Sequence, residues 1–394
     1  MARTGQSDPL TQADATAGEL VLFGVGDVGP LVDPSENGID SFSELVLPTL
    51  ATADVRIAQC ERLFSVRGTA QAAVGDQSHS LRPPAEAELF SECGFDVVSL
   101  ASNHALDFGA EALLDTLDLF RSKGIQTIGA GRNIEEARRP AFVERNGVRV
   151  AILGYCSVGR DGYSASATSP GIAPLRAHTY YEPVEYQAGL PPRVVTVPFA
   201  EDLEAMLEDI EAARQSADAV VLFNHWGLHI VPRVIADYQD AYALAAFEAG
   251  ADLIIGHHAH VPKAIAVYDG KVCFHSVGNF IVSGTAHLAG RSVKRYGAVL
   301  EDCFRSLIAS ARITRDGVRE VSFLPVQIDE KARPEPLSSG DPRFQDAVEF
   351  MEWVSEGFPH QFDRREDGNV VVTDDPDFLS ADARPQIMRP PVEL

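Results

Sequence analysis

Three histidines stand within four positions in the segment IIGHHAHVPKAI, residues 254–265. The apolar residues before them are typical of a buried strand. Neutral imidazole nitrogens are common ligands of divalent transition metals, so this segment could bind a metal. A polar turn that is merely rich in imidazole is the alternative, and the segment by itself does not choose between the two.

Other polar side chains follow predicted strands in the same way. In open α/β sheets, ligands bind beyond the carboxyl ends of the strands, so we expect such side chains to converge. Two carboxylates, an amide oxygen and several imidazoles suit Mn, Fe or Zn better than Ca or a thiolate-bound structural zinc. The residues at or just beyond these strand ends are Asp27, Glu61, Asn103, His104, His225, His258 and His260.

The elements that must position these residues alternate between strands and helices. Apolar runs are followed by amphipathic helices such as residues 110–124, and the pattern then changes to hairpins. This order predicts an α/β fold with mixed sheets over residues 18–330. The hairpin turns are predicted at Asn146-Gly147, Asp269-Gly270 and Asp316-Gly317.

Three other regions lack this alternation. Residues 157–192 are rich in Gly, Ser, Pro and Tyr and are predicted to form a long loop, either a lid over a substrate or a simple surface insertion. Residues 1–17 are polar and predict a disordered tail. Residues 331–394 contain one helix candidate at 342–357 and are expected to pack on the domain as a C-terminal extension.

Composition limits the function classes. The 394 residues carry a formal net charge of −24, which disfavours nucleic acid or an anionic membrane as the main partner. The five cysteines are scattered without metal-binding spacing, as in a reduced cytosolic protein. No apolar run reaches the roughly 18 residues that span a bilayer. We therefore expect a cytoplasmic protein without a membrane anchor, and the sequence gives no indication of its oligomeric state.

Six motifs in a fixed order resemble one known family. They are GVGD, QCERLFS, LASNHALDFG, NHWG, GHHAHV and HSVGNFI, from about residue 19 to about residue 283. The series resembles the CapA family of poly-γ-glutamate capsule synthesis proteins, in the calcineurin-like metallophosphoesterase superfamily. The resemblance implies a metallo-dependent phosphatase-like fold, a four-layer α/β/β/α sandwich of mixed sheets. It also implies two divalent metal ions (Mn, Fe or Zn) between the strand ends.

The resemblance also implies a role for each matching residue. Metal ligands would be Asp27 and His260 at the first ion, Glu61 as the bridging acid, and Asn103, His225 and His258 at the second. His104 resembles the histidine that protonates a leaving group, although an isolated histidine could simply be a core residue. Asp107 could orient His104 or cap the next helix. Candidate substrate contacts are His229, His257, Asn279 and Arg62, of which His257 and Asn279 could instead only support the pocket.

The sequence departs from the family pattern at three places. The first motif reads Asp27-Val28-Gly29 where calcineurin-like enzymes generally have Asp-x-His, and Gln59-Cys60-Glu61 stands where Asn-Leu-Glu is usual. His229 replaces a glutamate commonly found after HWG. The first metal is therefore expected to have fewer protein ligands, and to be held weakly, completed by water, or absent from some preparations.

These observations predict a soluble, metal-dependent hydrolase of the CapA type. Its two-metal centre would activate water against a phosphoester or acyl phosphate, or against a glutamyl-like amide bond, in capsule or peptide-type biosynthesis. The partner would be a small-molecule or peptide-like anionic substrate, which Arg62, Arg67, Arg82, Arg160 or Lys263 could contact. The alternative is a non-catalytic accessory component of a polymer- or peptide-assembly complex, with a structural or vestigial metal site.

Overall fold

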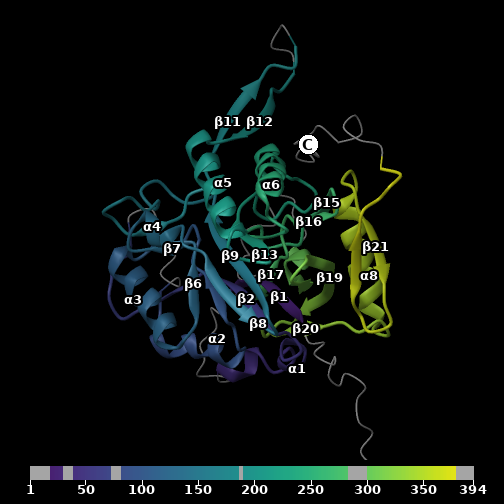
Figure 1. Cartoon of the computed structure of the whole chain (residues 1–394), viewed down its shortest axis with the longest axis horizontal. Coiled ribbons are helices and arrows are strands. Elements are labelled where there is room, and N and C mark those ends of the chain that lie inside the picture. Colours follow the sequence, from purple (N-terminus) through teal and green to yellow (C-terminus); the bar gives the residue numbers. More distant parts are fainter. Residues whose placement is uncertain (1–17, 30–38, 72–80, 186–189, 283–299, 379–394) are drawn as a thin grey trace, which may run out of the picture.

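Two mixed β-sheets form the centre of the molecule (Figure 1). The computed structural model describes residues 18–29, 39–71, 81–185, 190–282 and 300–378. The predicted tail over residues 1–17 lies outside the described residues.

The larger sheet has parallel strands on one side and antiparallel strands on the other. Across the sheet the strands are β21 (Gln361–Arg364), β22 (Val370–Thr373), β19 (Gly317–Ile328), β18 (Arg305–Thr314), β1 (Glu19–Val28), β2 (Val55–Cys60), β5 (Val97–Ser99) and β6 (Gln126–Ile128). Strands β1, β2, β5 and β6 are parallel, so their carboxyl ends share one edge. Two short strands complete the sheet, β17 (Asn279–Ile281) parallel to β1 and β20 (Pro334–Pro336) beside β19.

The smaller sheet is also parallel at its centre. Its strands are, in order, β15 (Ile265–Tyr268), β16 (Lys271–Phe274), β14 (Leu253–His257), β13 (Ala219–His225), β9 (Val148–Cys156) and β8 (Ala141–Arg145). Strands β9, β13, β14 and β16 are parallel, and β8 and β15 pair antiparallel at the two edges. All seven residues of β13 are buried, as expected for a strand covered on both faces.

Helices cover the outer face of each sheet. The larger sheet is covered by α1 (Leu47–Leu50), α2 (Glu88–Glu92) and α3 (Gly109–Ser122), and the smaller one by α5 (Ala200–Arg214) and α6 (Asp237–Ala249). A separate apolar core joins the two inner faces, for example Ile57 of β2 and Phe223 of β13. The predicted four-layer α/β/β/α sandwich is therefore confirmed.

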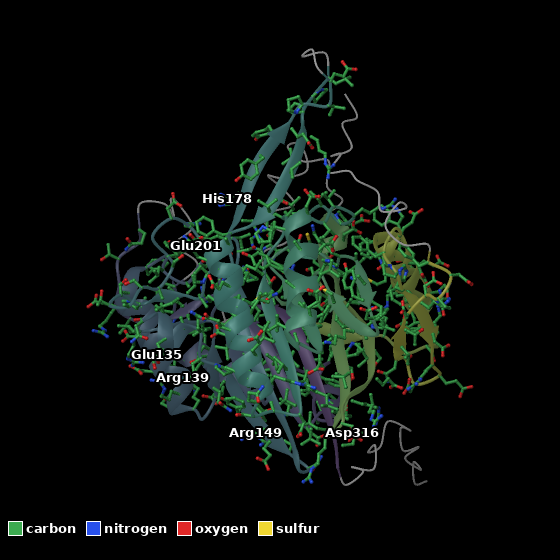
Figure 2. The ribbon with its side chains drawn as sticks, turned by 45° about the horizontal axis from the view of Figure 1, so that its top comes forward. Glu135, Arg139, Arg149, His178, Glu201 and Asp316 are labelled. Atoms are coloured by element: carbon green, nitrogen blue, oxygen red, sulfur yellow. The ribbon has the colours of Figure 1, made fainter. Side chains whose placement is uncertain are left out.

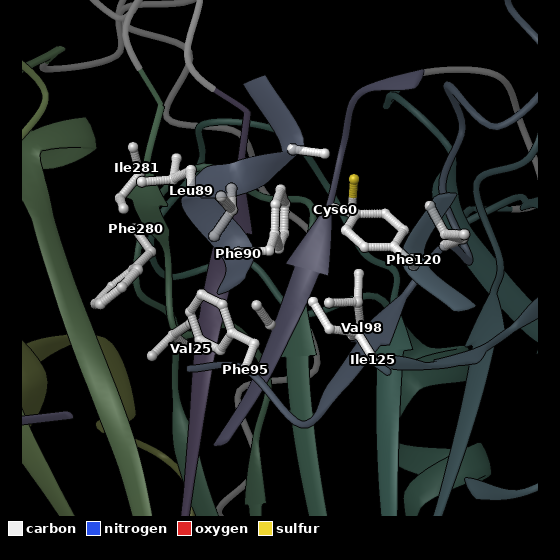
Figure 3. Packing of buried hydrophobic residues seen from close by; sticks show 14 of the residues in the cluster. Val25, Cys60, Leu89, Phe90, Phe95, Val98, Phe120, Ile125, Phe280 and Ile281 are labelled. Atoms are coloured by element: carbon white, nitrogen blue, oxygen red, sulfur yellow. The ribbon is translucent and has the colours of Figure 1, made fainter. Parts of the chain in front are cut away.

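The helix layer on the larger sheet shows why the chain folds this way. In α3 the residues Leu113, Leu117 and Phe120 share one helical face and are fully buried. Phe120 meets Phe90 of α2 edge to face, with ring centroids 4.9 Å apart. Figure 3 shows both rings beside the strands that carry Val25 and Val98. An amphipathic helix thus finds its partner on the apolar outer face of β1, β2 and β5.

All three predicted hairpins are present. Asn146 and Gly147, between β8 and β9, both have positive φ angles of 55° and 78°, which the favoured two-residue hairpin turn requires. The turn at Asp269-Gly270 joins β15 to β16. Between β18 and β19 the turn residues are Arg315 and Asp316, one position earlier than predicted, because Gly317 begins β19 and pairs with Thr314. The strand β17, which follows β16 in the chain, pairs with β1 in the other sheet.

The predicted long loop over 157–192 needs a correction. It contains β10 (Gly171–Ile172), which pairs with β7 (Ala130–Gly131), and β11 (Ala177–Glu182), which pairs with β12 (Arg193–Pro198). The β11–β12 hairpin projects from the body of the molecule (Figure 1). Most of its residues stay exposed, so the strands leave no strong apolar pattern in the sequence.

The remaining elements are short or belong to the C-terminal region. In that region α8 (Pro342–Ser355) inserts Val348 and Met351 into the core between the sheets, and β20, β21 and β22 extend the larger sheet. The short elements are β3 (Leu63–Phe64), β4 (Leu81–Arg82), α4 (Ile134–Ala137), and the 3₁₀ turns η1 (Ile39–Phe42), η3 (Pro84–Ala87) and η4 (Leu300–Phe304).

The sandwich has two distinct ends. Figure 2 shows Arg149 and Asp316, near two hairpin turns, at one end and His178 of β11 at the other. Strands β1, β9 and β13 run toward the end with His178, so their carboxyl ends lie there. Among the described residues, none of the helices combines the length and apolar character that crossing a lipid bilayer demands.

Candidate metal centre

Two adjacent strand ends from each sheet meet at this edge of the sandwich. In the larger sheet β1 and β2 are neighbours, and the N–H of Glu61, just beyond β2, donates to the carbonyl of Val28 at 3.1 Å. In the smaller sheet β13 and β14 end side by side, with His225 opposite His257. The inner packing of the two sheets brings both pairs of ends together, which places acids from one sheet against imidazoles from the other.

Two buried carboxylates lie at the centre of this cluster. Asp27 Oδ1 and Glu61 Oε1 are shielded from solvent and accept no hydrogen bond from any described residue. Burial, and next the charge of Glu61, raise the pKa of Asp27 well above its usual value. Burial alone would raise the pKa of Glu61 as well, but the charges of His260 and then Arg62 lower it. The two acids are therefore unequal, and Asp27 is the one that tends to hold a proton.

Three imidazoles face the carboxylates from β13 and β14. His225 Nε2 lies 2.8 Å from Asn103 Oδ1, 3.1 Å from His258 Nδ1 and 3.6 Å from Glu61 Oε1. Burial lowers the pKa of His225, His257 and His258 well below the usual histidine value. These rings are neutral at pH 7, so each has one nitrogen lone pair that can bind a metal.

His258 and His260 stand on a turn with an unusual backbone. Their φ angles are 88° and 59°, in the left-handed region that side-chain-bearing residues seldom adopt. The backbone N–H of His258 donates to Asp27 Oδ2 at 3.2 Å. His260 Nδ1 lies 2.7 Å from Asn279 Oδ1, and its Nε2 lies 3.9 Å from Glu61 Oε2. The turn therefore directs both rings toward the carboxylates.

The arrangement fits divalent cations. Three groups each place one ligating atom per residue within 4.8 Å of one another: Asp27, His225 and His257; Glu61, His225 and His258; and Asp27, Glu61 and His260. Unpartnered carboxylate oxygens beside neutral imidazoles are the donor set that Zn, Mn or Fe accept. Because buried carboxylates without partners are costly, a bound cation would relieve the structure of an unfavourable charge.

His104 and Asp107 form a second unit beside the carboxylates. His104 Nδ1 lies 2.6 Å from Asp107 Oδ2, and the His104 N–H donates to Ser102 Oγ at 3.0 Å. Burial alone would raise the pKa of Asp107, but the hydrogen bond and charge of His104, together with Tyr163 and Arg160, hold it below its usual value. An ionised Asp107 accepts the Nδ1 proton of His104, so Nε2 is the ring nitrogen available to a substrate.

Tyr163 and Arg160 complete this unit. The sequence alone did not identify Tyr163 as a site residue. The Tyr163 hydroxyl donates to Asp107 Oδ1 at 2.9 Å, and an Arg160 nitrogen lies 3.4 Å from the same oxygen. Both residues come from the predicted long loop over 157–192. Tyr163 lies 56 positions from Asp107 in the chain, and no periodic pattern around it indicates the contact.

The predicted substrate contacts fall into two pairs. Arg62 is buried against Glu61, and His229 is exposed at the rim with its ring 4.0 Å from that of His258. The packing of the His229 ring lowers its pKa to about 4, first through partial burial and then through the charge of His260. Of the two, His229 is the residue that an entering molecule can reach, whereas Arg62 is buried.

The other pair lies deeper than expected. His257 is fully buried beneath His225, with 2.8 Å between their Nδ1 atoms, so solvent does not reach it. Asn279 uses its amide to hold His260, and it also donates to the carbonyls of His260 and Cys303 at 3.3 and 3.2 Å. The Asn279 amide atoms thus contact protein groups, whereas His257 Nε2 has no hydrogen-bond partner among the described residues and its ring belongs to the ligand group of Asp27 and His225.

Three basic residues that the sequence offered as substrate contacts have partners within the protein. Arg67 pairs with Asp115, and Arg82 pairs with Glu86 at 2.6 Å. Lys263 is buried, donates to the carbonyl of Val234 at 2.7 Å, and burial lowers its pKa to about 7. Two surface hollows, one beside Arg121 and Arg139 and the other beside Phe64 and Asp115, share no lining residue with the metal-ligand groups.

Two curated relatives are similar to this chain. The chain is 30% identical over 263 residues to the PGA biosynthesis protein CapA of Bacillus subtilis (strain 168), which covers 65% of this chain and 62% of that protein. It is 32% identical over 194 residues to the capsule biosynthesis protein CapA of Bacillus anthracis, covering 48% and 41%. The chain thus spans about three fifths of the first relative and two fifths of the second.

A solved structure and a family model complete the comparison. The calcineurin-like phosphoesterase YfkN from Bacillus subtilis overlaps 86% of this chain and 99% of its own, with 12% identity and a TM-score of 0.40, which is a weak likeness. The family model described as "Bacterial capsule synthesis protein PGA_cap" matches residues 13–283, which span all the candidate ligands. Because this match covers more than half of the 394 residues, the chain belongs to the bacterial capsule synthesis protein family PGA_cap.

Proposed function

We propose that the protein is a metal-dependent hydrolase of the CapA type with a two-ion centre. The observation that carries this proposal is the meeting of Asp27 and Glu61, both with an unpartnered oxygen, with the neutral rings of His225 and His258. A purely structural cluster would be expected to satisfy its own buried carboxylates. This cluster leaves them for a cation.

The protein and the ions divide the work. When bound, divalent ions would supply an activated water and would polarise the bond to be cleaved. Asp27, Glu61, Asn103, His225, His258 and His260 would hold them. Two ions would bring four positive charges against two negative carboxylates, so the pocket would attract an anion although the chain as a whole carries a net charge of −24.

His104 would deliver the proton that the leaving group needs. Asp107 fixes its Nδ1 side, and the half-buried ring keeps Nε2 at the edge of the site. Protonated His104 would donate from Nε2 to the departing oxygen or nitrogen, while Asp107 stabilises the charged ring before the transfer. Asp107 would act as a positioning residue because it touches His104 and not the substrate.

The substrate class follows from the site and from the family. Arg62 adds a buried positive charge beside the proposed ions, and the exposed His229 lies next to His258; together with the ions, that charge favours a substrate with a negative group beside the bond that breaks. The relatives described above are biosynthesis proteins for PGA and for capsule. The proposed bond is therefore a phosphoester or acyl phosphate, or a glutamyl-like amide, in capsule or peptide-type biosynthesis.

The test combines metal content with two substrates. Purified protein is analysed for bound metal and then assayed with Mn²⁺ on an aryl phosphate and on a γ-glutamyl amide. We expect metal-dependent hydrolysis of one of the two, abolished by a chelator. Absence of bound metal, of both activities and of any thermal shift on adding Mn²⁺ would refute the proposal. Tight metal binding without either activity would favour an accessory component with a structural metal.

A further inference from the structure

Arg62 is a buried guanidinium inside the candidate metal centre. It is 5% exposed, one of its terminal nitrogens lies 3.9 Å from Glu61 Oε2 and donates to the Glu61 carbonyl at 3.0 Å, and its Nε has no hydrogen-bond partner among the described residues. An arginine stays protonated in proteins, so it adds one permanent positive charge to this site.

The backbone makes room for this side chain. Gly29 lies just beyond β1, and a Cβ built on it would stand 2.8 Å from Arg62 Cγ and 3.1 Å from Nε. Only glycine allows the Arg62 side chain to pass so close to the chain that carries Asp27. The space in which a larger residue at position 29 could have placed a further metal ligand is therefore taken by an arginine.

The position of Arg62 divides the centre into unequal halves. The two oxygens of Glu61 face different partners: Oε1 is 3.6 Å from His225 Nε2, whereas Oε2 is 3.9 Å from both His260 Nε2 and Arg62. Burial lowers the pKa of Arg62, while the charges of Glu61, Asp27 and Asp107 oppose that change. The positive charge of the guanidinium therefore offsets part of the negative charge that would attract an ion to Asp27, Glu61 Oε2 and His260.

We propose that Arg62 is a built-in cation that makes the centre asymmetric, with one ion held tightly by Glu61, His225 and His258 and a second ion held only weakly by Asp27, Glu61 and His260. This inference rests on the metal centre proposed above. Arg62 lies beside Glu61 Oε2, the oxygen nearer to His260, so its positive charge would repel a divalent ion held by Asp27, Glu61 and His260. An ion held by Glu61, His225 and His258 would use the other side of the Glu61 carboxylate and would be repelled less.

The test measures Mn²⁺ binding rather than turnover. Isothermal titration calorimetry gives the number and affinity of ions, and electron paramagnetic resonance distinguishes isolated Mn²⁺ from a coupled pair. For the wild-type protein we expect one tight ion and the spectrum of isolated Mn²⁺. In Arg62→Met, which keeps the apolar stem and removes the charge, the second ion should bind at least about tenfold more tightly and a coupled spectrum should appear.

Two further variants serve as controls. Arg62→Lys keeps the charge and should behave like the wild type, and Arg67→Met removes an exposed arginine that pairs with Asp115, away from the centre. Thermal unfolding of the metal-free variants confirms that they fold. Unchanged Mn²⁺ binding in Arg62→Met would overturn the inference. Absence of Mn²⁺ binding in the wild type would instead overturn the proposed metal centre itself.

Discussion

The two sheets contribute different chemistry to the same site. The strand ends of the larger sheet bring the carboxylates Asp27 and Glu61 and the His104–Asp107 unit, which carry charge and protons. The strand ends of the smaller sheet bring His225, His257 and His258, which burial keeps neutral. Charge lies on one side and uncharged donors lie on the other, and each of the three candidate ligand groups draws on both.

This division shows what the metal-free protein must tolerate. Its carboxylates repel each other and each has one oxygen without a hydrogen-bond partner among the described residues, whereas its imidazoles resist protonation. Removal of either acid should therefore weaken metal binding, and removal of Asp27, whose pKa is raised by burial, should also stabilise the metal-free fold. Acidification should act mainly on the side with the histidines.

The largest effect is expected for Glu61→Gln. Glu61 offers one oxygen to each of two ligand groups, so its loss should weaken Mn²⁺ binding by more than the roughly 10- to 100-fold that follows loss of an outer partner. The metal-free variant should melt lower than the wild type, because the buried Arg62 loses the carboxylate that faces it. Calorimetric titration and thermal unfolding measure both. Glu135→Gln, an exposed carboxylate of α4 (Figure 2), is the control, and wild-type affinity in Glu61→Gln would contradict the assignment.

His104→Ala should separate proton transfer from metal binding. Because His104 is in none of the ligand groups, the variant should keep its bound metal. Its turnover should fall about 10²- to 10⁴-fold, the usual contribution of a general acid. His178→Ala removes an exposed histidine of the β11–β12 hairpin and should change neither property. Equal loss of metal and turnover would show that His104 is a ligand.

Acidification of the metal-free protein should have opposite effects on stability through the histidines and through Asp27. The pKa values of His225, His257 and His258 lie well below the usual 6.5, so below pH 6.5 the unfolded chain binds more protons than the folded protein. The stability of the fold therefore decreases as the pH is lowered, by at most about 1.4 kcal/mol per pH unit for each ring. The raised pKa of Asp27 has the opposite sign, since the folded state takes up its proton first.

Denaturant unfolding between pH 8 and pH 5 in the presence of chelator measures this balance. Three rings outweigh one carboxyl, so the wild type should lose stability on acidification. Asp27→Asn lacks the opposing proton uptake and should lose more stability per pH unit. A wild-type stability that stays constant or rises below pH 6.5 would mean that these imidazoles are not buried in neutral form.

The smallest effect is expected for Tyr163→Phe. The variant removes one hydrogen bond to Asp107, typically about 1 kcal/mol, so turnover should fall about fivefold while Mn²⁺ binding stays unchanged. The acidic limb of the pH–rate profile should also move, which a merely structural role would not cause. Tyr180→Phe, on the exposed hairpin, is the control. Unchanged turnover and pH profile would remove Tyr163 from the site.

Most of the ligand set was accessible from the sequence because each member ends a buried apolar run. Asp27, Glu61, His225 and His258 follow strands whose patterns are strong, and parallel strands must end at a common edge. The alternation of strands and helices predicted an α/β fold with mixed sheets, the Asn-Gly and Asp-Gly pairs predicted the hairpin turns, and the family resemblance implied the four layers. Local patterns were sufficient wherever a local apolar run decided the structure.

The remainder depends on contacts that no local pattern records. Tyr163 reaches Asp107 from a segment without periodicity, and the hairpin from Ala177 to Pro198 is mostly exposed. The segment Asn279–Ile281 pairs with the carboxyl end of β1, at Asp27 and Val28, beyond the residues of β1 that pair with β18, although its sequence equally suits the preceding hairpin. The family pattern assigned His258 to the metal and left His257 open between a substrate contact and a supporting residue, and only the three-dimensional arrangement shows that His257 is enclosed.

The left-handed backbone at His258 and His260 has an evolutionary consequence. Residues with side chains pay roughly 1–3 kcal/mol for such conformations, and glycine or asparagine would adopt them more readily. Selection for a stable fold therefore acts against histidine at both positions, and only selection for the function of the site retains it. In a descendant that no longer needs the site, these two positions should be among the first to drift, toward glycine or asparagine.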